Sequence, residues 1–245
     1  MIVDHRPVVQ RMSALVQHWE TVPDRRAIFL GCYTLMTRNM LDAVEAGRFH
    51  DGAWVSRLLH RFADYYFDAL EVYEQNPGAS PRVWRLAHDA ARRDEVLTVQ
   101  HLMLGVNAHI NFDLIFTLAE LLEPEWDTLP DDARDARRAD YLHVNTIIGE
   151  TIDRVQDTIL EPRSPWLDVV DKLLGPMDEW LTSRLVTGWR GQVWADAIRL
   201  MTLRDKRRRR EFRGEIEAAA VRRGYNILGD LRETRTTKDA DTWPI

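Results

Sequence analysis

The side chains best suited to chemistry lie in one apolar stretch, LGVNAHINFDL, at residues 104–114. Within it, His109 and Asp113 stand four residues apart, and so do Asn107 and Asn111. On an α-helix this spacing puts the members of a pair on one face, while a step of two residues turns about 200° and sets the two pairs on opposite sides. An imidazole beside a carboxylate can transfer protons or ligate a metal ion, and amides can position a substrate.

The helix predicted around this stretch has no polar face, so we expect it to be surrounded by protein. An unsatisfied buried amide costs roughly 1–3 kcal/mol, and an unpaired carboxylate costs more, so these groups must be paired, hydrated or bound to a ligand. Gly105 lies one turn before His109 and is expected to leave open space beside the imidazole. Polarity and space together predict a cavity. The alternative is a structural network in which Asp113 pairs with His109 and the asparagines bridge neighbouring helices.

Helical periodicity extends over nearly the whole chain, and no alternating strand pattern stands out. We predict an all-α, single-domain bundle around a central buried helix at residues 94–122, with residues 1–228 as the domain and 229–245 as a polar tail. Helices 51–75, 131–160 and 177–209 are expected to flank the central one. The remaining predicted helices are 8–20, 24–46, 81–92, 164–174 and 211–228.

Composition narrows the class of protein. The formal net charge of -6 argues against a general affinity for nucleic acid or anionic lipid, and the single cysteine, Cys32, is expected to be a buried thiol. The N-terminus lacks the pattern of a secretory signal, and we find no apolar segment that approaches the roughly 20 residues of a membrane span. We therefore expect a cytoplasmic protein with a small-molecule substrate, no nucleic-acid partner and no membrane span, and we leave a homodimer open.

Several segments together resemble a known family. The stretch 104–114, the segment 24–54 upstream, and the segments DYLHVNTIIGETIDRVQD and SPWLDVVDKLLGPMDEWL downstream are similar to a largely bacterial family known as domain of unknown function 5995. The resemblance covers roughly residues 20–200. It implies no established activity.

A shorter resemblance suggests a metal site. The pattern L-G-x-x-x-H-x-x-x-D, which runs here from Leu104 to Asp113, is similar to a ligand helix of the zinc-dependent phospholipase C and single-strand nuclease group. That resemblance implies a divalent ion, zinc, manganese or iron, on His109 and Asp113. His60 and Asp64 repeat the H-x-x-x-D spacing and are a second candidate pair of ligands, although we favour a solvated helix edge as the explanation of that pair.

Three other features could contribute to a site. Asn145 lies beside Gly149 on a helical stripe and could face Asn107 and Asn111 across a shared pocket. Arg190 and Arg199 could neutralise an anionic ligand there. The basic cluster, Leu203 to Arg213, could bind anions but is equally typical of a solvated helix end.

From these observations we favour an enzyme with a buried His/Asp/Asn site. His109 would be a metal ligand or general base, Asp113 its co-ligand or orienting group, and Asn107, Asn111 and Asn145 the groups that position the substrate. Metal-assisted hydrolysis is the most specific version. A metal-free isomerase or cyclase acting on a largely apolar molecule is the first alternative, and a non-enzymatic small-molecule-binding or helical interaction protein is the second.

Overall fold

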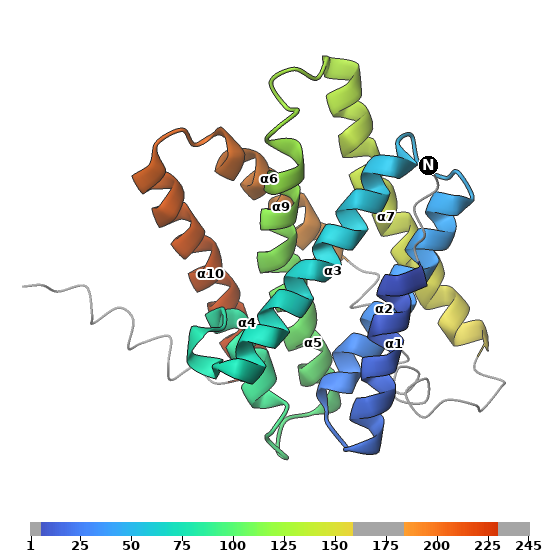
Figure 1. Ribbon diagram of the computed structural model, residues 1–245, viewed down its shortest axis with the longest axis vertical. Helices are drawn as coiled ribbons and strands as arrows, with labels where there is room; N and C mark the ends of the chain where they lie inside the picture. The colour runs from blue at the N-terminus through green and yellow to red at the C-terminus, as the bar shows by residue number, and fades with distance from the viewer. Residues whose placement is uncertain (1–5, 159–183, 230–245) are drawn as a thin grey trace, which may run out of the picture.

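The predicted central helix forms the middle of the molecule. In the computed structural model, which describes residues 6–158 and 184–229, it consists of α5 (Thr98–Ala108), a π-helical turn η2 (His109–Asp113) and α6 (Leu114–Leu122) (Figure 1). Residues 94–97, predicted as its first turn, lie outside the helix. The backbone N–H of Leu97 donates to the side-chain carbonyl of Gln100 at 2.9 Å, and this contact begins the helix at Thr98.

Helices cover the central one on several sides, which confirms the predicted all-α, single-domain bundle. α5 packs against α2, α4 and α10, and α6 packs against α3 and α9. In Figure 1, α10 lies on the left of the central helix and α1 and α2 lie on its right. The surrounding elements are α1 (Arg6–Thr21), α2 (Arg26–Glu45), α3 (Gly52–Gln75), η1 (Pro77–Ala79), α4 (Arg82–Ala90), α7 (Asp131–Thr158), α9 (Arg184–Thr202) and α10 (Lys206–Leu228).

Two expectations about the neighbours of the central helix were wrong in detail. α7, expected to flank it, packs instead on α2. The predicted helix 177–209 ends at Thr202, and α10 begins at Lys206, because the side chain of Asp205 accepts the backbone N–H of Arg208 and caps a new helix. The predicted helix 164–174 and the tail after residue 229 lie outside the described residues.

The π-helical turn is the main irregularity in the central helix. The backbone N–H of Leu114 bonds to the carbonyl of His109, five residues earlier. The hydroxyl of Thr117 donates to the carbonyl of Asp113 at 2.9 Å. π-helical turns are rare and occur frequently at functional sites. This one begins at His109 and ends at Asp113.

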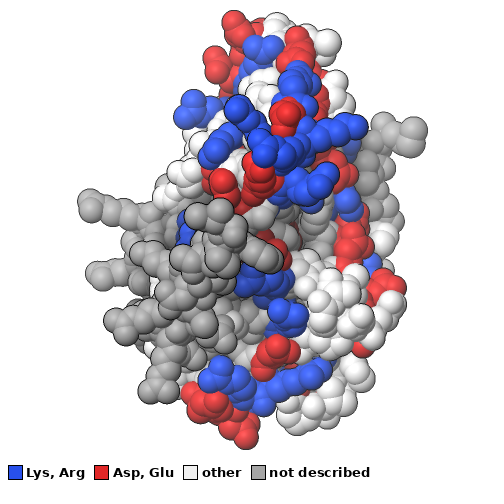
Figure 2. All heavy atoms as spheres, turned by 90° about the vertical axis from the view of Figure 1, so that its left-hand side faces the viewer, with Lys and Arg blue, Asp and Glu red and all other residues white. Residues whose placement is uncertain are grey.

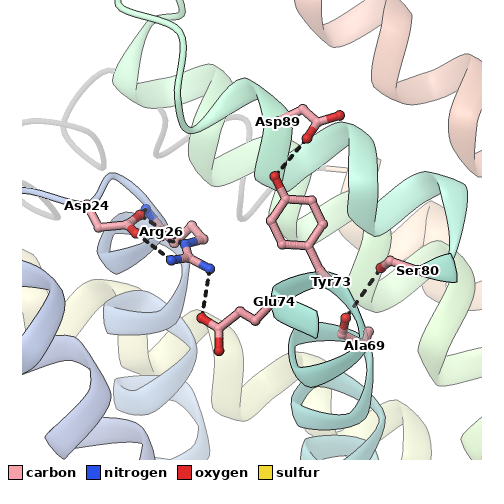
Figure 3. A network of polar contacts seen from close by, with 7 residues as sticks. All are labelled: Asp24, Arg26, Ala69, Tyr73, Glu74, Ser80 and Asp89. Carbon is pink, nitrogen blue, oxygen red and sulfur yellow. Dashed lines mark hydrogen bonds and ion pairs between the residues drawn. The ribbon is translucent and has the colours of Figure 1, made fainter. Parts of the chain in front are cut away.

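Polar contacts connect α2, α3 and α4, three helices around the central one (Figure 3). At the start of α2, the guanidinium of Arg26 donates to Asp24 at 2.6–3.0 Å and to Glu74 of α3 at 3.2 Å. Close by, the hydroxyl of Tyr73 in α3 donates to Asp89 of α4 at 2.7 Å. The network therefore ties α2, α3 and α4 together.

The stretch Thr98–Leu122 is long and apolar enough to cross a bilayer, contrary to our expectation that no segment would be. However, 89% of its apolar window is buried inside the protein, as is usual for a core helix. Burial at the centre of the bundle therefore explains why this stretch is so apolar.

Candidate functional site

His109 and Asp113 form a hydrogen-bonded pair at the two ends of the π-helical turn. His109 Nδ1 lies 3.0 Å from Asp113 Oδ2. The indole N–H of Trp84, on α4, donates to both carboxyl oxygens of Asp113 at 3.1 and 2.9 Å. Because a hydrogen bond at Nδ1 fixes the orientation of the ring, the pair presents Nε2 as its free end.

Aromatic rings surround the imidazole of His109. Phe62 of α3 stacks on it at a centroid distance of 3.5 Å and an interplanar angle of 9°. Tyr33 of α2 meets its edge at 4.3 Å, and Phe29 approaches at 5.8 Å. The pair is thus almost completely removed from water, with His109 3% exposed and Asp113 1% exposed.

Burial sets the charge state of the pair. It lowers the pKa of His109 well below its usual value. It also raises the pKa of Asp113 well above its usual value, although the hydrogen bond from Trp84 opposes that shift. Both shifts favour the uncharged forms, so we expect a neutral pair that shares one proton between Nδ1 and Oδ2.

A cavity of about 130 Å³ lies beside His109. Its wall comes from α2, α3, the central helix, α7 and Arg190 of α9. Val144 and Ile148 of α7 line the cavity together with Val106 and Ile110 of the central helix, so the cavity adjoins both of the helices that we had expected to pack together. The wall is largely apolar and also includes Met36, Met40, Leu58, Leu59, Phe62 and Leu114.

Some polar atoms of the wall lack a hydrogen-bond partner among the described residues, although His109 and Arg190 each bond through another nitrogen. His109 Nε2, the hydroxyls of Tyr33 and Thr37, and Arg190 Nε are all buried without a partner in the structure. The fifth polar residue of the wall, Cys32, is a free buried thiol as expected, and burial raises its pKa to about 12. A thiol with such a pKa is a poor nucleophile, which leaves His109, Tyr33, Thr37 and Arg190 as the groups that could meet a ligand.

Gly105 does not open space beside the imidazole as expected. A Cβ atom built on it would lie 2.3 Å from Cγ and 2.5 Å from Cδ2 of Phe29. The ring of Phe29 therefore fills the space that the glycine leaves, and the same ring lines the cavity. The glycine permits the close approach of α2, and the cavity lies elsewhere around His109.

Asn107 and Asn111 lie on the face of the central helix that contacts α10. The amide of Asn107 donates to the carbonyl of Ala220 at 2.8 Å, and the amide of Asn111 donates to the side-chain carbonyl of Asn107 at 3.1 Å. Neither residue lines the cavity. These contacts match the structural reading of the pair, and their role in positioning a substrate stays a prediction.

Asn145 is placed on α7, beside the cavity residue Val144 but outside the cavity wall. Its side-chain carbonyl oxygen is buried without a partner. No hydrogen bond joins it to Asn107 or Asn111 within the described part of the chain, since those amides bond to α10 and to each other. The shared pocket of asparagines is therefore not formed.

His60 and Asp64 lie apart from this site. His60 Nδ1 contacts the carbonyl of Ser56 at 2.8 Å, and Asp64 is an exposed residue 3.9 Å from the guanidinium of Arg61. Across residues 6–158 and 184–229, His, Cys, Asp and Glu side chains form no group of three or more that could hold a metal ion. Catalytic zinc sites use three protein ligands, so His109 and Asp113 alone are an incomplete set.

A second, smaller pocket of about 20 Å³ lies on the other side of Phe29 and was not predicted. It contains His88 and His101, whose side chains are buried and have ring nitrogens without partners. Burial lowers the pKa of both, that of His88 to about 3. The volume suits one water molecule.

The basic cluster lies at the start of α10 among acidic neighbours. Figure 2 shows blue and red side chains intermingled on this side of the molecule. Arg209 pairs with Glu123, and Arg204 pairs with Asp127 at 2.6 Å. These pairs support the reading of the cluster as a solvated helix end.

Comparison with known proteins identifies the family to which the chain belongs. Residues 6–230 match the model of a family described as "Family of unknown function (DUF5995)", which covers most of the chain and agrees with the resemblance found in the sequence. No curated protein and no solved structure matches the chain.

Proposed function

We propose that this chain, which belongs to the DUF5995 family of unknown function, binds a small, largely apolar molecule beside His109 and transfers protons to and from it. The reaction class would be a metal-free isomerisation or cyclisation. One observation carries the proposal: an apolar cavity adjoins a buried His109–Asp113 pair, and Nε2 of His109 has no partner among residues 6–158 and 184–229.

The cavity suits a compact ligand. A cavity of roughly 150 Å³ in another protein holds benzene, which has six carbon atoms, so about 130 Å³ corresponds to roughly five or six non-hydrogen atoms. The methionine, leucine and aromatic side chains of the wall favour a hydrocarbon body. The hydroxyls of Tyr33 and Thr37 can bond to one polar group of the ligand, in keeping with the few polar groups of typical ligand sites.

The pair can move a proton in both directions. In the uncharged pair, the O–H of the Asp113 carboxyl donates a hydrogen bond to Nδ1 of His109, and Nε2 carries the proton of the imidazole. When Nε2 gives this proton to the ligand, Nδ1 takes the proton of Asp113, and the imidazole stays neutral. Nε2 then removes a proton from a second position of the ligand while the Asp113 proton returns. One proton has moved within the ligand, and no co-reactant is consumed.

The indole of Trp84 supports this exchange. During it, Asp113 becomes a carboxylate in an apolar interior, where an unpaired charge would be costly. The N–H of Trp84 donates to both oxygens and stabilises that form. Trp84 is therefore a positioning residue, because it acts through Asp113.

Proton transfer can be tested with simple ketones. We would incubate the protein with cyclopentanone and 2-pentanone in D2O and follow deuterium incorporation next to the carbonyl by NMR. General acid–base groups contribute roughly 10²- to 10⁴-fold, so His109→Gln should lower the protein-catalysed rate by about that factor. His101→Gln, which alters a buried histidine of the other pocket, should keep the rate.

Binding is tested separately by saturation-transfer NMR with the same ketones. Val106→Phe fills the cavity and should abolish the signal, whereas Val22→Phe alters a residue that is 53% exposed and should leave it unchanged. The proposal is refuted if neither ketone binds, or if exchange persists at the wild-type rate in His109→Gln.

A further inference from the structure

Arg190 is a buried cation on the wall of the cavity. Its side chain comes from α9, the residue is 4% exposed, and it lines the same cavity as His109. The sequence suggested Arg190 and Arg199 equally as partners of an anion. Arg199 is exposed and lies over the ring of Phe212 at 3.9 Å, so only Arg190 is at the site.

Within the part of the chain that the structure describes, the contacts of Arg190 leave its positive charge without an anion. Nη2 donates to the backbone carbonyl of Tyr141 at 2.9 Å, and the guanidinium lies 4.3 Å above the ring of Tyr141. Nε has no partner. Among the described residues, no carboxylate pairs with Arg190, and no Asp or Glu lines the cavity.

Burying an arginine in this way is costly. Arginine is almost never fully buried unless it is paired, because taking the charge out of water carries a large desolvation penalty. A carbonyl and a ring face compensate only part of that penalty. Burial accordingly lowers the pKa of Arg190. An arginine held in this way is suited to a carboxylate, whose two oxygens match the planar guanidinium.

We infer that the ligand of this cavity is a small carboxylic acid with an apolar body, whose carboxylate pairs with Arg190. The hydrocarbon part occupies the space between α2, α7 and the central helix, where it also meets His109. A single arginine and an otherwise apolar wall favour one negative charge over the higher charge of a phosphate. This inference rests on the proposed function, because it names the substrate class of the same site.

The test compares matched anionic and neutral probes. Butyrate and cyclopropanecarboxylate, each with six non-hydrogen atoms, would be titrated against the protein by ligand-observed NMR, beside butanamide and cyclopropanecarboxamide, which have similar shapes and no charge. We expect each carboxylate to bind at least about tenfold more tightly than its amide. Loss of one partner of a buried charge pair weakens binding by roughly 30-fold or more, so Arg190→Met should remove the preference for the carboxylate.

Two further variants make the result specific. Arg190→Lys keeps the charge and should keep the preference for the carboxylate in weaker form, which matters if Arg190→Met does not fold. Arg199→Met removes an exposed arginine of the same helix and should leave all four affinities unchanged. Without ligand, Arg190→Met should be at least as resistant to urea as the wild type, because it removes an unpaired buried charge.

The outcomes separate this inference from the proposed function. If the ketones and amides bind and the carboxylates bind no better, the inference is wrong while the proposed function stands. Equal affinities for butyrate in the wild type and Arg190→Met would also overturn it. If no probe of either kind binds, both proposals fail.

Discussion

Replacing Gly105 by alanine tests how tightly α2 is packed on the central helix. The new Cβ would lie 2.3 Å from Cγ, 2.5 Å from Cδ2 and 2.7 Å from Cβ of Phe29. All three distances are far below a van der Waals contact. Because Cβ of Phe29 is fixed to the backbone of α2, rotation of the ring cannot relieve the whole overlap, and α2 must move.

The expected magnitude is the balance of two effects. Alanine favours an interior helical position over glycine by about 1 kcal/mol, whereas overpacking a filled core costs about 1–3 kcal/mol. Since the overlap reaches Cβ of Phe29, the upper part of that range applies, and we expect a net loss of about 2 kcal/mol. This corresponds to a fall in Tm of roughly 4–8 °C for a chain of this length.

Gly214→Ala is the matched control. Gly214 lies within α10, and nothing stands within 4 Å of its added Cβ atom. Only the helix preference applies there, so this variant should gain up to about 1 kcal/mol. Urea unfolding followed by circular dichroism measures both changes. If the two variants have the same free energy of unfolding, the side chain of Phe29 can move aside without loss of stability, and the tight enclosure of His109 described above is wrong.

Two further predictions concern Asp113 and His88. Trp84→Phe removes the indole N–H that bonds to Asp113, whereas Trp54→Phe removes an equally buried N–H that has no partner. We expect Trp84→Phe to be less stable than Trp54→Phe by about 1–3 kcal/mol in urea unfolding, and equal values would contradict the hydrogen bond. The pKa of His88 is lowered to about 3 in the folded state, so the unfolded chain binds the proton more readily and stability is lost as the pH falls from about 6.5 towards 3. Between pH 7 and pH 5 His88 alone should account for a loss of about 2 kcal/mol, which His88→Phe should abolish; an unchanged pH dependence in that variant would assign the effect to other groups.

Much of the fold could be predicted because helical periodicity is a local property. The apolar stretch around residues 98–122 showed that its helix would be enclosed on all sides, and the structure confirms this. The boundary between α9 and α10 was placed too late because the basic run 206–210 continues a helical pattern. A single hydrogen bond from the backbone of Arg208 to Asp205 decides where the new helix begins.

The candidate site was only partly predictable for the same reason. The spacing of His109 and Asp113 indicated that they would meet, and they do at 3.0 Å. Trp84 and Phe62, which complete their surroundings, come from other helices, and no sequence spacing relates them to the pair. The wall of the cavity likewise depends on how five helices pack, so Gly105 suggested a space that Phe29 in fact fills.

The π-helical turn has a consequence for the register of the central helix. Each residue advances an α-helix by about 100°, so the additional residue in this turn rotates every side chain of α6 by that angle relative to α5. Before the turn, α5 packs against α2, α4 and α10, and after it, α6 packs against α3 and α9. Removing one residue between His109 and Asp113 would turn Glu120, which is exposed and bonds to Arg61, away from its partner and bring apolar side chains of α6 to the surface. The extra residue therefore lets one helix satisfy two sets of neighbours that an unbroken α-helix could not satisfy together.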